Sequence, residues 1–371
     1  MVDLSGQHDK IRNEIDSAIN QILNTTAFIK GPDVAAFESE LAEYLQVKHV
    51  IGCANGTDAL QLALMALDLP EGAEVITPDF TFVATAEVVR LLKLTPVLVD
   101  VDPNTFNLDI AKLKLAISDK TRVIIPVHLF GQCANMNLIM DIAKEHDLFV
   151  IEDNAQALGS DYNFQGKNVK AGTIGHIGCT SFFPSKNLGA AGDAGALFTN
   201  DDVLADKIKS IANHGQGDQY FYREIGVNSR MDTLQAAILR IKLRHLASYN
   251  EARQAAAAAY DAAFSNNPHL QIPTRAAGST HIFHQYTLKV KNGKRDTLGK
   301  YLDEHKVPNK VYYPCPIHVH KPYAESCRFD VSQLSVSLQL SEEVISLPMH
   351  TELSEEQLSF ITNTVNNFFN H

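Results

Sequence analysis

Apolar residues recur near the start of the chain at the spacing of a helix. Ile11, Ile15, Ile19 and Leu23 form a stripe with a period close to four. This stripe predicts a helix that lies on the outside of the main domain. A second helix is predicted over residues 34–44.

A strand, loop and helix unit follows these two segments. Residues 49–54 (HVIGCA) predict a strand, and residues 55–69 (NGTDALQLALMALDL) predict a helix. Asn55 and Thr57 can cap a helix that starts near Asp58.

The same alternation of strand and helix continues as far as residue 154. The predicted strands cover residues 74–78, 95–101, 122–129 and 148–154, and the helices between them cover residues 82–93, 108–117 and 136–146. Several of these strands are continuous apolar runs, typical of strands that are buried on both faces of a parallel sheet. We therefore predict an α/β fold with a mostly parallel central sheet flanked by helices.

The pattern changes in the last third of the chain. A long helical stretch over residues 232–264 has apolar residues at helical spacing and an alanine-rich second half, and we expect it to link two domains. After Pro268, a short strand candidate over residues 284–290 stands among helical segments over residues 295–305 and 354–369. The prediction is a large domain over residues 1–250 and a small C-terminal α+β domain over residues 251–371.

Charge and composition narrow the range of partners. The 371 residues are 45% hydrophobic and carry a formal net charge of −11. A non-specific grip on nucleic acid or on an anionic membrane needs a basic surface, so neither partner is expected. A small anionic ligand in a local basic pocket is compatible with this charge.

The cysteines and the polar start of the chain bear on its location. The five cysteines are odd in number, far apart and without a CxxC pair, which favours reduced thiols. The first residues lack an apolar signal segment, and no run of about 18 apolar residues follows. We expect a cytoplasmic protein without a signal peptide or a membrane span.

Lys186 lies in the most distinctive segment, residues 180–200 (TSFFPSKNLGAAGDAGALFTN). It stands between a Ser/Pro turn and a glycine-rich stretch. Most lysines lie on the surface, so the alternative is that Lys186 is an ordinary surface residue. A lysine that forms a Schiff base must lie on a constrained loop, partly desolvated and close to an anion site, and this context favours that role.

Two acidic residues end the predicted strand in residues 150–159 (VIEDNAQALG). The carboxyl edge of a parallel sheet is where α/β proteins bind ligands. Asp153 is our candidate for a carboxylate that pairs with the protonated pyridine nitrogen of a bound cofactor. The alternative is that Glu152 and Asp153 only terminate the strand or bind a metal, although no His or Cys stands beside them at ligand spacing.

A third candidate is the start of the helix after residues 53–60 (CANGTDAL). Main-chain N–H groups at a helix start, together with the Thr57 hydroxyl, can bind an anion. Capping alone also explains Asn55 and Thr57.

Together these segments resemble the DegT/StrS family of nucleotide-sugar aminotransferases, which are fold-type I enzymes that depend on pyridoxal 5′-phosphate (PLP). The resemblance runs nearly end to end. Its motifs, in the order of the family, are FIKGPDVAAFE, CANGTDALQLAL, EVITPDFTFVATAEVV, PVHLFGQCANM, VIEDNAQALG, CTSFFPSKNLGAAGDAGAL, NHGQ, GVNSRMDTLQAAIL, VYYPCPIHVHKPY and LPMH.

The resemblance implies roles for the cofactor-binding residues. Lys186 forms the Schiff base and later moves a proton between the cofactor's C4′ and the sugar carbon. Asp153 pairs with the pyridine nitrogen, and Gln156 approaches the 3′-oxygen.

The resemblance also assigns the ring face and the phosphate. Phe82 stacks on the pyridine, with a core aromatic as the alternative. Gly56, Thr57 and Ser181 bind the phosphate. Asn228 reaches it from a neighbouring subunit, which implies a homodimer with shared active sites.

The resemblance further places the substrate contacts. Tyr312, Tyr313 and His318 match positions that face the sugar nucleotide, although family members often have a histidine where this chain has Tyr312. A metal bound by His318 and His320 is disfavoured, because two histidines without further ligands seldom suffice. Arg230 offers paired donors for a carboxylate, with an interface salt bridge as the alternative.

The motifs are most similar to those of bacterial enzymes that use L-glutamate to aminate C3 of UDP-2-acetamido-2-deoxy-3-oxo-glucuronate for surface-polysaccharide assembly, such as lipopolysaccharide O-antigen. The alternative substrate is a dTDP-linked 3-oxo-6-deoxyhexose. Two further classes stay open: a sugar dehydratase of the same fold, whose examples replace the Schiff-base lysine with histidine, and a non-catalytic binding or regulatory protein.

Overall fold

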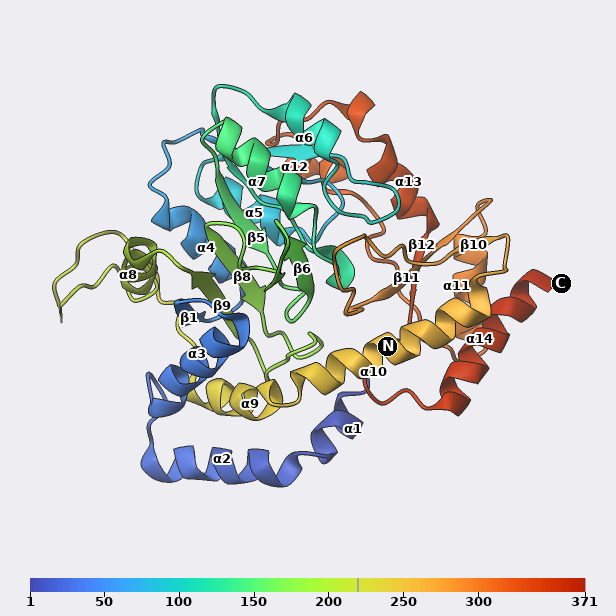
Figure 1. The fold of residues 1–371 in the computed structure, drawn as a ribbon, viewed down its shortest axis with the longest axis horizontal. Coiled ribbons are helices and arrows are strands. Elements are labelled where there is room, and N and C mark those ends of the chain that lie inside the picture. The colour runs from blue at the N-terminus through green and yellow to red at the C-terminus, as the bar shows by residue number, and fades with distance from the viewer. Residues whose placement is uncertain (219, 371) are drawn as a thin grey trace.

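A seven-stranded sheet forms the centre of the chain in the computed structural model, which describes residues 1–218 and 220–370 (Figure 1). The strands are β1 (His49–Cys53), β2 (Glu74–Pro78), β3 (Thr95–Val99), β4 (Thr121–Ile124), β5 (Phe149–Asp153), β8 (Ile177–Ser181) and β9 (Gly195–Thr199). Their order is β1-β9-β8-β5-β4-β2-β3, and only β9 runs antiparallel to its neighbours. The predicted mostly parallel α/β sheet is confirmed.

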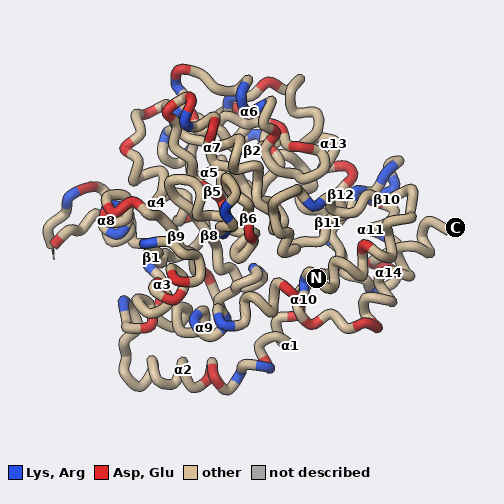
Figure 2. The backbone as a smooth tube through the Cα atoms, viewed as in Figure 1, with Lys and Arg blue, Asp and Glu red and all other residues tan. Residues whose placement is uncertain are grey.

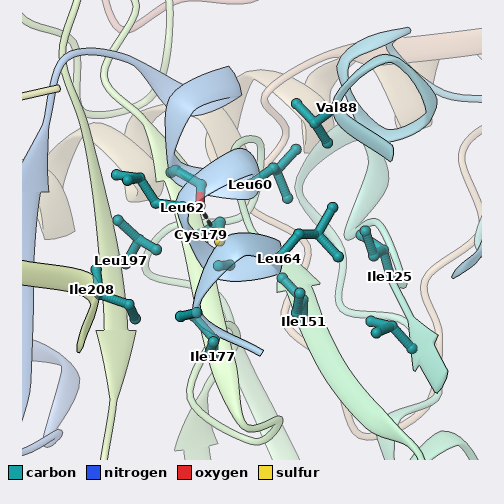
Figure 3. Close-up of a cluster of buried hydrophobic side chains, with 14 of the residues drawn as sticks. Leu60, Leu62, Leu64, Val88, Ile125, Ile151, Ile177, Cys179, Leu197 and Ile208 are labelled. Carbon is teal, nitrogen blue, oxygen red and sulfur yellow. Dashed lines mark hydrogen bonds between the residues drawn. The ribbon is translucent and has the colours of Figure 1, made fainter. Parts of the chain in front are cut away.

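Helices cover both faces of this sheet because its strands are apolar on both sides. The covering helices are α3 (Pro32–Leu45), α4 (Gly56–Ala66), α5 (Ala84–Leu91), α6 (Ile110–Ala116), α7 (Met136–Glu145), α8 (Asp202–Ile211) and α9 (Thr233–Leu243). Alternate residues of one strand join different cores: Val75 packs with α4, α5 and α8, and Ile76 packs with α6 and α7. Figure 3 shows the first of these cores, in which leucines of α4 lie over β5 and β8.

The N-terminal stripe packs as helical geometry requires. It forms α2 (Arg12–Thr25), after the short helix α1 (Leu4–Asp9), and Ile11 and Ile15 pack against α9. Leu23, at the end of the stripe, is 51% exposed, and Ile22 is buried instead. A period of 3.6 residues turns position 23 away from the face of Ile15.

The predicted helical stretch over residues 232–264 is two helices, α9 and α10 (Leu246–Phe264). The chain breaks between α9 and α10 because the two helices pack against different parts of the protein. α9 packs on α2 and α3, whereas Tyr260 and Phe264 of α10 enter the C-terminal core. Figure 1 shows α10 running from α9 toward the small sheet and α14.

The C-terminal part contains the predicted strand and the two predicted helices, together with elements that the pattern did not indicate. Its antiparallel sheet has the order β10 (Leu270–Gln271), β11 (Tyr286–Val290) and β12 (Val344–Leu347). Its helices are α11 (Arg295–Glu304), α12 (Lys321–Ala324), α13 (Ser335–Glu343) and α14 (Glu355–Asn370). A separate apolar core joins α10, α11 and α14 to this sheet. The domain boundary after residue 250 stays a prediction, and it falls within α10.

Several predicted element ends move for local reasons. The strand predicted over residues 122–129 ends at Ile124, because Pro126 has no N–H to donate to a neighbour. The helix predicted from residue 82 begins at Ala84. The pattern did not indicate α8, β9 or the hairpin of β6 (Asp161–Phe164) and β7 (Lys167–Lys170). Three short 3-10 turns lie at Leu129–Gly131, Ile317–Val319 and Val331–Gln333.

The charged residues are distributed over the whole outline of the chain. In Figure 2, Lys and Arg positions lie among Asp and Glu positions on the outer helices. Within residues 1–218 and 220–370, no helix combines the length and the apolar character that crossing a membrane requires.

Candidate active site

The carboxyl ends of β1, β5 and β8 meet at one edge of the sheet, where α4 also begins (Figure 1). A Cβ placed on Gly56 would lie 2.6 Å from the Cβ of Ser181, so only glycine allows this approach. The structure thus brings Gly56 and Ser181 together from positions 125 residues apart in the chain.

Asn55 caps the start of α4 as predicted, whereas Thr57 lies inside the helix. Asn55 Oδ1 accepts a hydrogen bond from the N–H of Asp58 at 2.8 Å, and the helix begins at Gly56 instead of near Asp58. The first N–H groups of a helix have no partner within it. Those of Gly56 and Thr57 are therefore free of helical bonds and suited to an anion.

Lys186 lies in a tight turn directly after β8. Its N–H donates to Phe183 O at 2.8 Å, and a Cβ on Gly189 would lie 2.3 Å from Pro184 O. The Lys186 side chain is partly buried, which makes it unlike an ordinary surface lysine. Burial lowers the pKa of Lys186 from 10.5 to about 8, and the charge of Asp153 opposes part of this shift.

Asp153 is the last residue of β5 and is 8% exposed. Burial raises its pKa, while the N–H of Ala155 and the charge of Lys186 act in the opposite direction. A carboxylate in this position can pair with a buried cation at the sheet edge. The charges of Asp153 and Lys186 therefore affect each other's pKa.

Glu152 has a different environment from its neighbour Asp153. It is fully buried and accepts hydrogen bonds from the N–H groups of Gly172, Ile174 and Gly175 at 2.5–2.9 Å. It also pairs with His128 Nε2 at 2.8 Å. Glu152 therefore anchors the turn before β8 and is not oriented toward a ligand.

Cys133 completes a buried group with His128 and Glu152, which the sequence did not indicate because Glu152 follows the other two by 19 and 24 residues and on a different element. Its ligand atoms lie within 4.8 Å of one another. The N–H of Ala134 donates to His128 Nδ1, so the ring proton lies on Nε2 and is donated to Glu152. Burial raises the pKa of the Cys133 thiol well above its usual value. A protonated thiol and a satisfied carboxylate do not suit a metal.

Gln156 connects the site to the loop after β4. Its Oε1 accepts the N–H of Phe130 at 2.8 Å, and its Nε2 donates to the Tyr313 hydroxyl at 3.2 Å. Burial raises the pKa of Tyr313, and Asp153 adds to this shift. Tyr313 therefore belongs to the same edge of the sheet. Tyr312 is partly buried beside it.

Phe82 lies just before α5 and is 56% exposed. The alternative that it is a core aromatic is wrong, since Phe80 fills the buried position instead. Phe82 is thus free to contact a ligand.

His318 is buried and held by Asp79, a residue whose role no sequence motif indicated. The Asp79 carboxylate accepts the main-chain N–H of His318 at 2.9 Å and lies 2.6 Å from its Nδ1. His318 is 5% exposed, whereas His320 is exposed. The pair joins the segment after Tyr313 to the loop between β2 and α5. Contact of His318 with a substrate stays a prediction.

Asn228 and Arg230 lie on a loop beside the start of α4. Ser229 Oγ accepts the N–H of Ala54 at 3.1 Å, and Asn228 itself is exposed. Arg230 Nη1 donates to Asn213 Oδ1 at 3.3 Å. Within one chain these residues flank the sheet edge, and their reach into another subunit stays a prediction.

Comparison with known proteins identifies this constellation. The sequence model of the DegT/DnrJ/EryC1/StrS aminotransferase family matches residues 9–366. The chain belongs to this family. A curated relative in Acidithiobacillus ferrooxidans, a UDP-N-acetyl-3-dehydro-alpha-D-glucosamine 3-aminotransferase, is 45% identical over 98% of this chain and 96% of its own length. The UDP-2-acetamido-2-deoxy-3-oxo-D-glucuronate aminotransferase of Pseudomonas aeruginosa is 42% identical over 99% of both chains.

A third relative carries a regulatory name. The pleiotropic regulatory protein of Geobacillus stearothermophilus is 43% identical over 100% of this chain and 98% of its own length.

Solved structures agree with the family in fold and cofactor. A DegT/DnrJ/EryC1/StrS aminotransferase from Brucella abortus superposes with a TM-score of 0.94 at 42% identity, covering 99% of this chain and 98% of the other. NtdA from Bacillus subtilis, solved with the bound cofactor PMP, has a TM-score of 0.89 at 30% identity, with 98% and 82% coverage. The DegT-family chain described here is an aminotransferase that depends on PLP.

Proposed function

We propose that this aminotransferase moves the amino group of L-glutamate to C3 of a UDP-linked 3-oxo sugar, with UDP-2-acetamido-2-deoxy-3-oxo-glucuronate as the leading acceptor. The observation that carries the proposal is 42–45% identity, over nearly the whole chain, to two enzymes named for the amination of such sugars.

Lys186 and Asp153 are the proposed catalytic residues. PLP, when bound, supplies an electron sink for amino transfer. A Lys186 pKa of about 8 leaves part of the amine neutral near neutral pH, so Lys186 can act as nucleophile and then move a proton. Asp153, buried at the end of β5, can hold a proton on the pyridine nitrogen.

The residues at the start of α4 fit the cofactor's phosphate. The close approach of Gly56 to Ser181 forms a cradle that a Cβ at Gly56 would fill. The N–H groups of Gly56 and Thr57 and the Ser181 hydroxyl offer donors to a dianion. This local site suits an anionic cofactor although the chain as a whole is acidic.

Phe82 and Gln156 complete the proposed cofactor contacts. Phe82 is exposed and can stack on the pyridine ring. Gln156 is held by Phe130 and Tyr313, which leaves its amide in a defined orientation for the 3′-oxygen.

The proposed substrate contacts are Arg230, Tyr312, Tyr313 and His318. The guanidinium of Arg230 is partly buried and bonds a neutral amide, Asn213, so it can take a carboxylate in two parallel bonds. Both L-glutamate and a uronic acid carry one. His318 would act from the position that Asp79 imposes on it.

We also propose a homodimer in which Asn228 completes the site of the other subunit. Exposed apolar residues on the same loop support this, because Phe221 is 74% exposed and Ile225 is 87% exposed. A second copy would bury such side chains at a two-fold interface. A cytoplasmic location and a role in surface-polysaccharide assembly belong to the same proposal, and the five free cysteines suit a reducing compartment.

Two alternatives define the controls. A dTDP-linked 3-oxo-6-deoxyhexose is the alternative acceptor, and a regulatory role is the alternative to catalysis. A dehydratase of this fold is disfavoured by Lys186 at the Schiff-base position.

The test is an assay of purified enzyme with L-glutamate and each keto sugar nucleotide, with the amino-sugar product measured by mass spectrometry. We expect amination of the UDP-linked uronate to have the highest kcat/KM. Lys186→Ala should bind PLP without covalent attachment and lose turnover, whereas the surface variant Lys93→Ala should retain it. A preference for the dTDP-linked sugar would overturn the substrate assignment, and turnover by Lys186→Ala would overturn the mechanism.

A further inference from the structure

His284 is a buried histidine beside the active site that the roles above leave unused. It lies two residues before β11 and is 6% exposed. Its Nδ1 has no hydrogen-bond partner among residues 1–218 and 220–370. A buried polar atom without a partner is costly, which points to a group that it meets during function.

The peptide that carries His284 is fastened to two loops of the site. The N–H of Ile282 donates to Gly131 O at 2.9 Å, and the next residue after His284, Gln285, donates to Phe130 O at 3.4 Å. Gly131 has a φ of +108°, and a Cβ there would lie 2.9 Å from the N of His284. The loop that orients Gln156 therefore lies directly against His284.

A second set of hydrogen bonds holds the loop that carries Lys186. Asn187, the residue after Lys186, donates from Nδ2 to Ile282 O at 3.2 Å and to Asn250 Oδ1 at 2.7 Å. The hydrogen bond between Asn187 and Ile282 thus lies one residue from Lys186 and two residues from His284 along the chain. A change at His284 can reach Lys186 without passing through the cofactor.

Charged groups surround the imidazole from several elements. Burial lowers the pKa of His284 well below its usual value, and the charges of Lys186 and Arg253 lower it further. Arg253 of α10 is 3% exposed and donates to the main-chain oxygens of Phe283, His284 and Met349. His284 is therefore neutral, and its unprotonated ring nitrogen can accept a hydrogen bond.

We propose that His284 is a positioning residue, whose Nδ1 accepts a hydrogen bond from a water bound to the Lys186 amine whenever that amine is not joined to the cofactor. The contact returns the amine to one place between proton transfers. The inference rests on Lys186 as the reactive amine of the proposed function.

The first test compares three variants in enzyme stripped of PLP. The pH dependence of Lys186 acetylation is measured by mass spectrometry on the Lys186 peptide. His284→Leu removes the hydrogen-bond acceptor that stabilises the Lys186 ammonium through the bound water. The pH midpoint of Lys186 acetylation should therefore fall by about one pH unit or more. His284→Asn keeps an acceptor near the Nδ1 position and should restore most of the wild-type midpoint.

His281→Asn is the matched control. His281 is also buried, three residues before His284, but its Nδ1 already accepts the N–H of Phe283 at 3.1 Å. This variant should leave the Lys186 midpoint unchanged. Equal shifts in His281→Asn and His284→Leu, or no shift in His284→Leu, would overturn the proposal.

A second measurement covers the case in which His284→Leu does not fold. A crystal structure of the wild-type enzyme without PLP should show a water within hydrogen-bond distance of both His284 Nδ1 and the Lys186 amine. Nδ1 bonded only to another group would refute the inference. Reduction of the PLP-loaded enzyme with borohydride separates the two claims, because failure to label Lys186 would refute its role as the reactive amine.

Discussion

The lowered pKa of Lys186 leads to a direct titration of its amine. With a pKa of about 8 in place of 10.5, the neutral fraction at pH 7 is about one in eleven instead of about one in three thousand. The fold therefore supplies about 300-fold more nucleophile at neutral pH. Since Lys186 is only partly buried, solvent reduces the shift, and this factor is an upper limit.

Asp153→Asn extends this prediction. The charge of Asp153 raises the pKa of Lys186 against the effect of burial, so its removal should move the Lys186 midpoint below that of the wild type. At the same time turnover should fall, because a neutral amide cannot hold the pyridinium proton. One variant thus improves the nucleophile and impairs the enzyme.

The assay is competitive acetylation of the enzyme stripped of PLP between pH 6 and pH 11, read on the Lys186 peptide. The peptide of Lys93, whose side chain is 75% exposed, is the internal reference. A Lys186 midpoint of 10 or higher would refute the reasoning from burial. A higher midpoint in Asp153→Asn would show that the two charges do not interact as the structure indicates.

Three further predictions address the other parts of the site. Glu152→Gln should lower the free energy of unfolding by about 3 kcal/mol in urea titrations, because an amide cannot accept the three N–H groups and the His128 bond together; unchanged stability would contradict it. Gly56→Ala should weaken PLP binding about tenfold or more by equilibrium titration, because its Cβ would meet Ser181, and wild-type affinity would exclude a phosphate site here. Arg230→Lys should reduce kcat/KM for glutamate or the uronate by roughly 10- to 150-fold in an intact dimer, since it loses the paired donors. A dissociated dimer, or unchanged kinetics with both substrates, would favour an interface role for Arg230.

The sequence by itself determined the order of most strands and helices and the residues that carry the chemistry. Helical spacing of apolar residues predicts the helices, and continuous apolar runs such as residues 148–151 predict strands that are buried between two layers. The motifs around Asp153 and Lys186 carry the family resemblance because each is a short run of consecutive residues. These are local properties, readable without knowledge of the fold.

Only the tertiary structure decided which distant residues meet. Asp79 holds His318 across 239 positions, and the group of His128, Cys133 and Glu152 shows that Glu152 anchors the fold while its neighbour Asp153 is left for the site. Strand alternation separates adjacent side chains onto opposite faces, but their partners come from other strands and loops. The same limit applies to His284, whose relation to Lys186 depends on packing between the two parts of the chain, which local pattern does not encode.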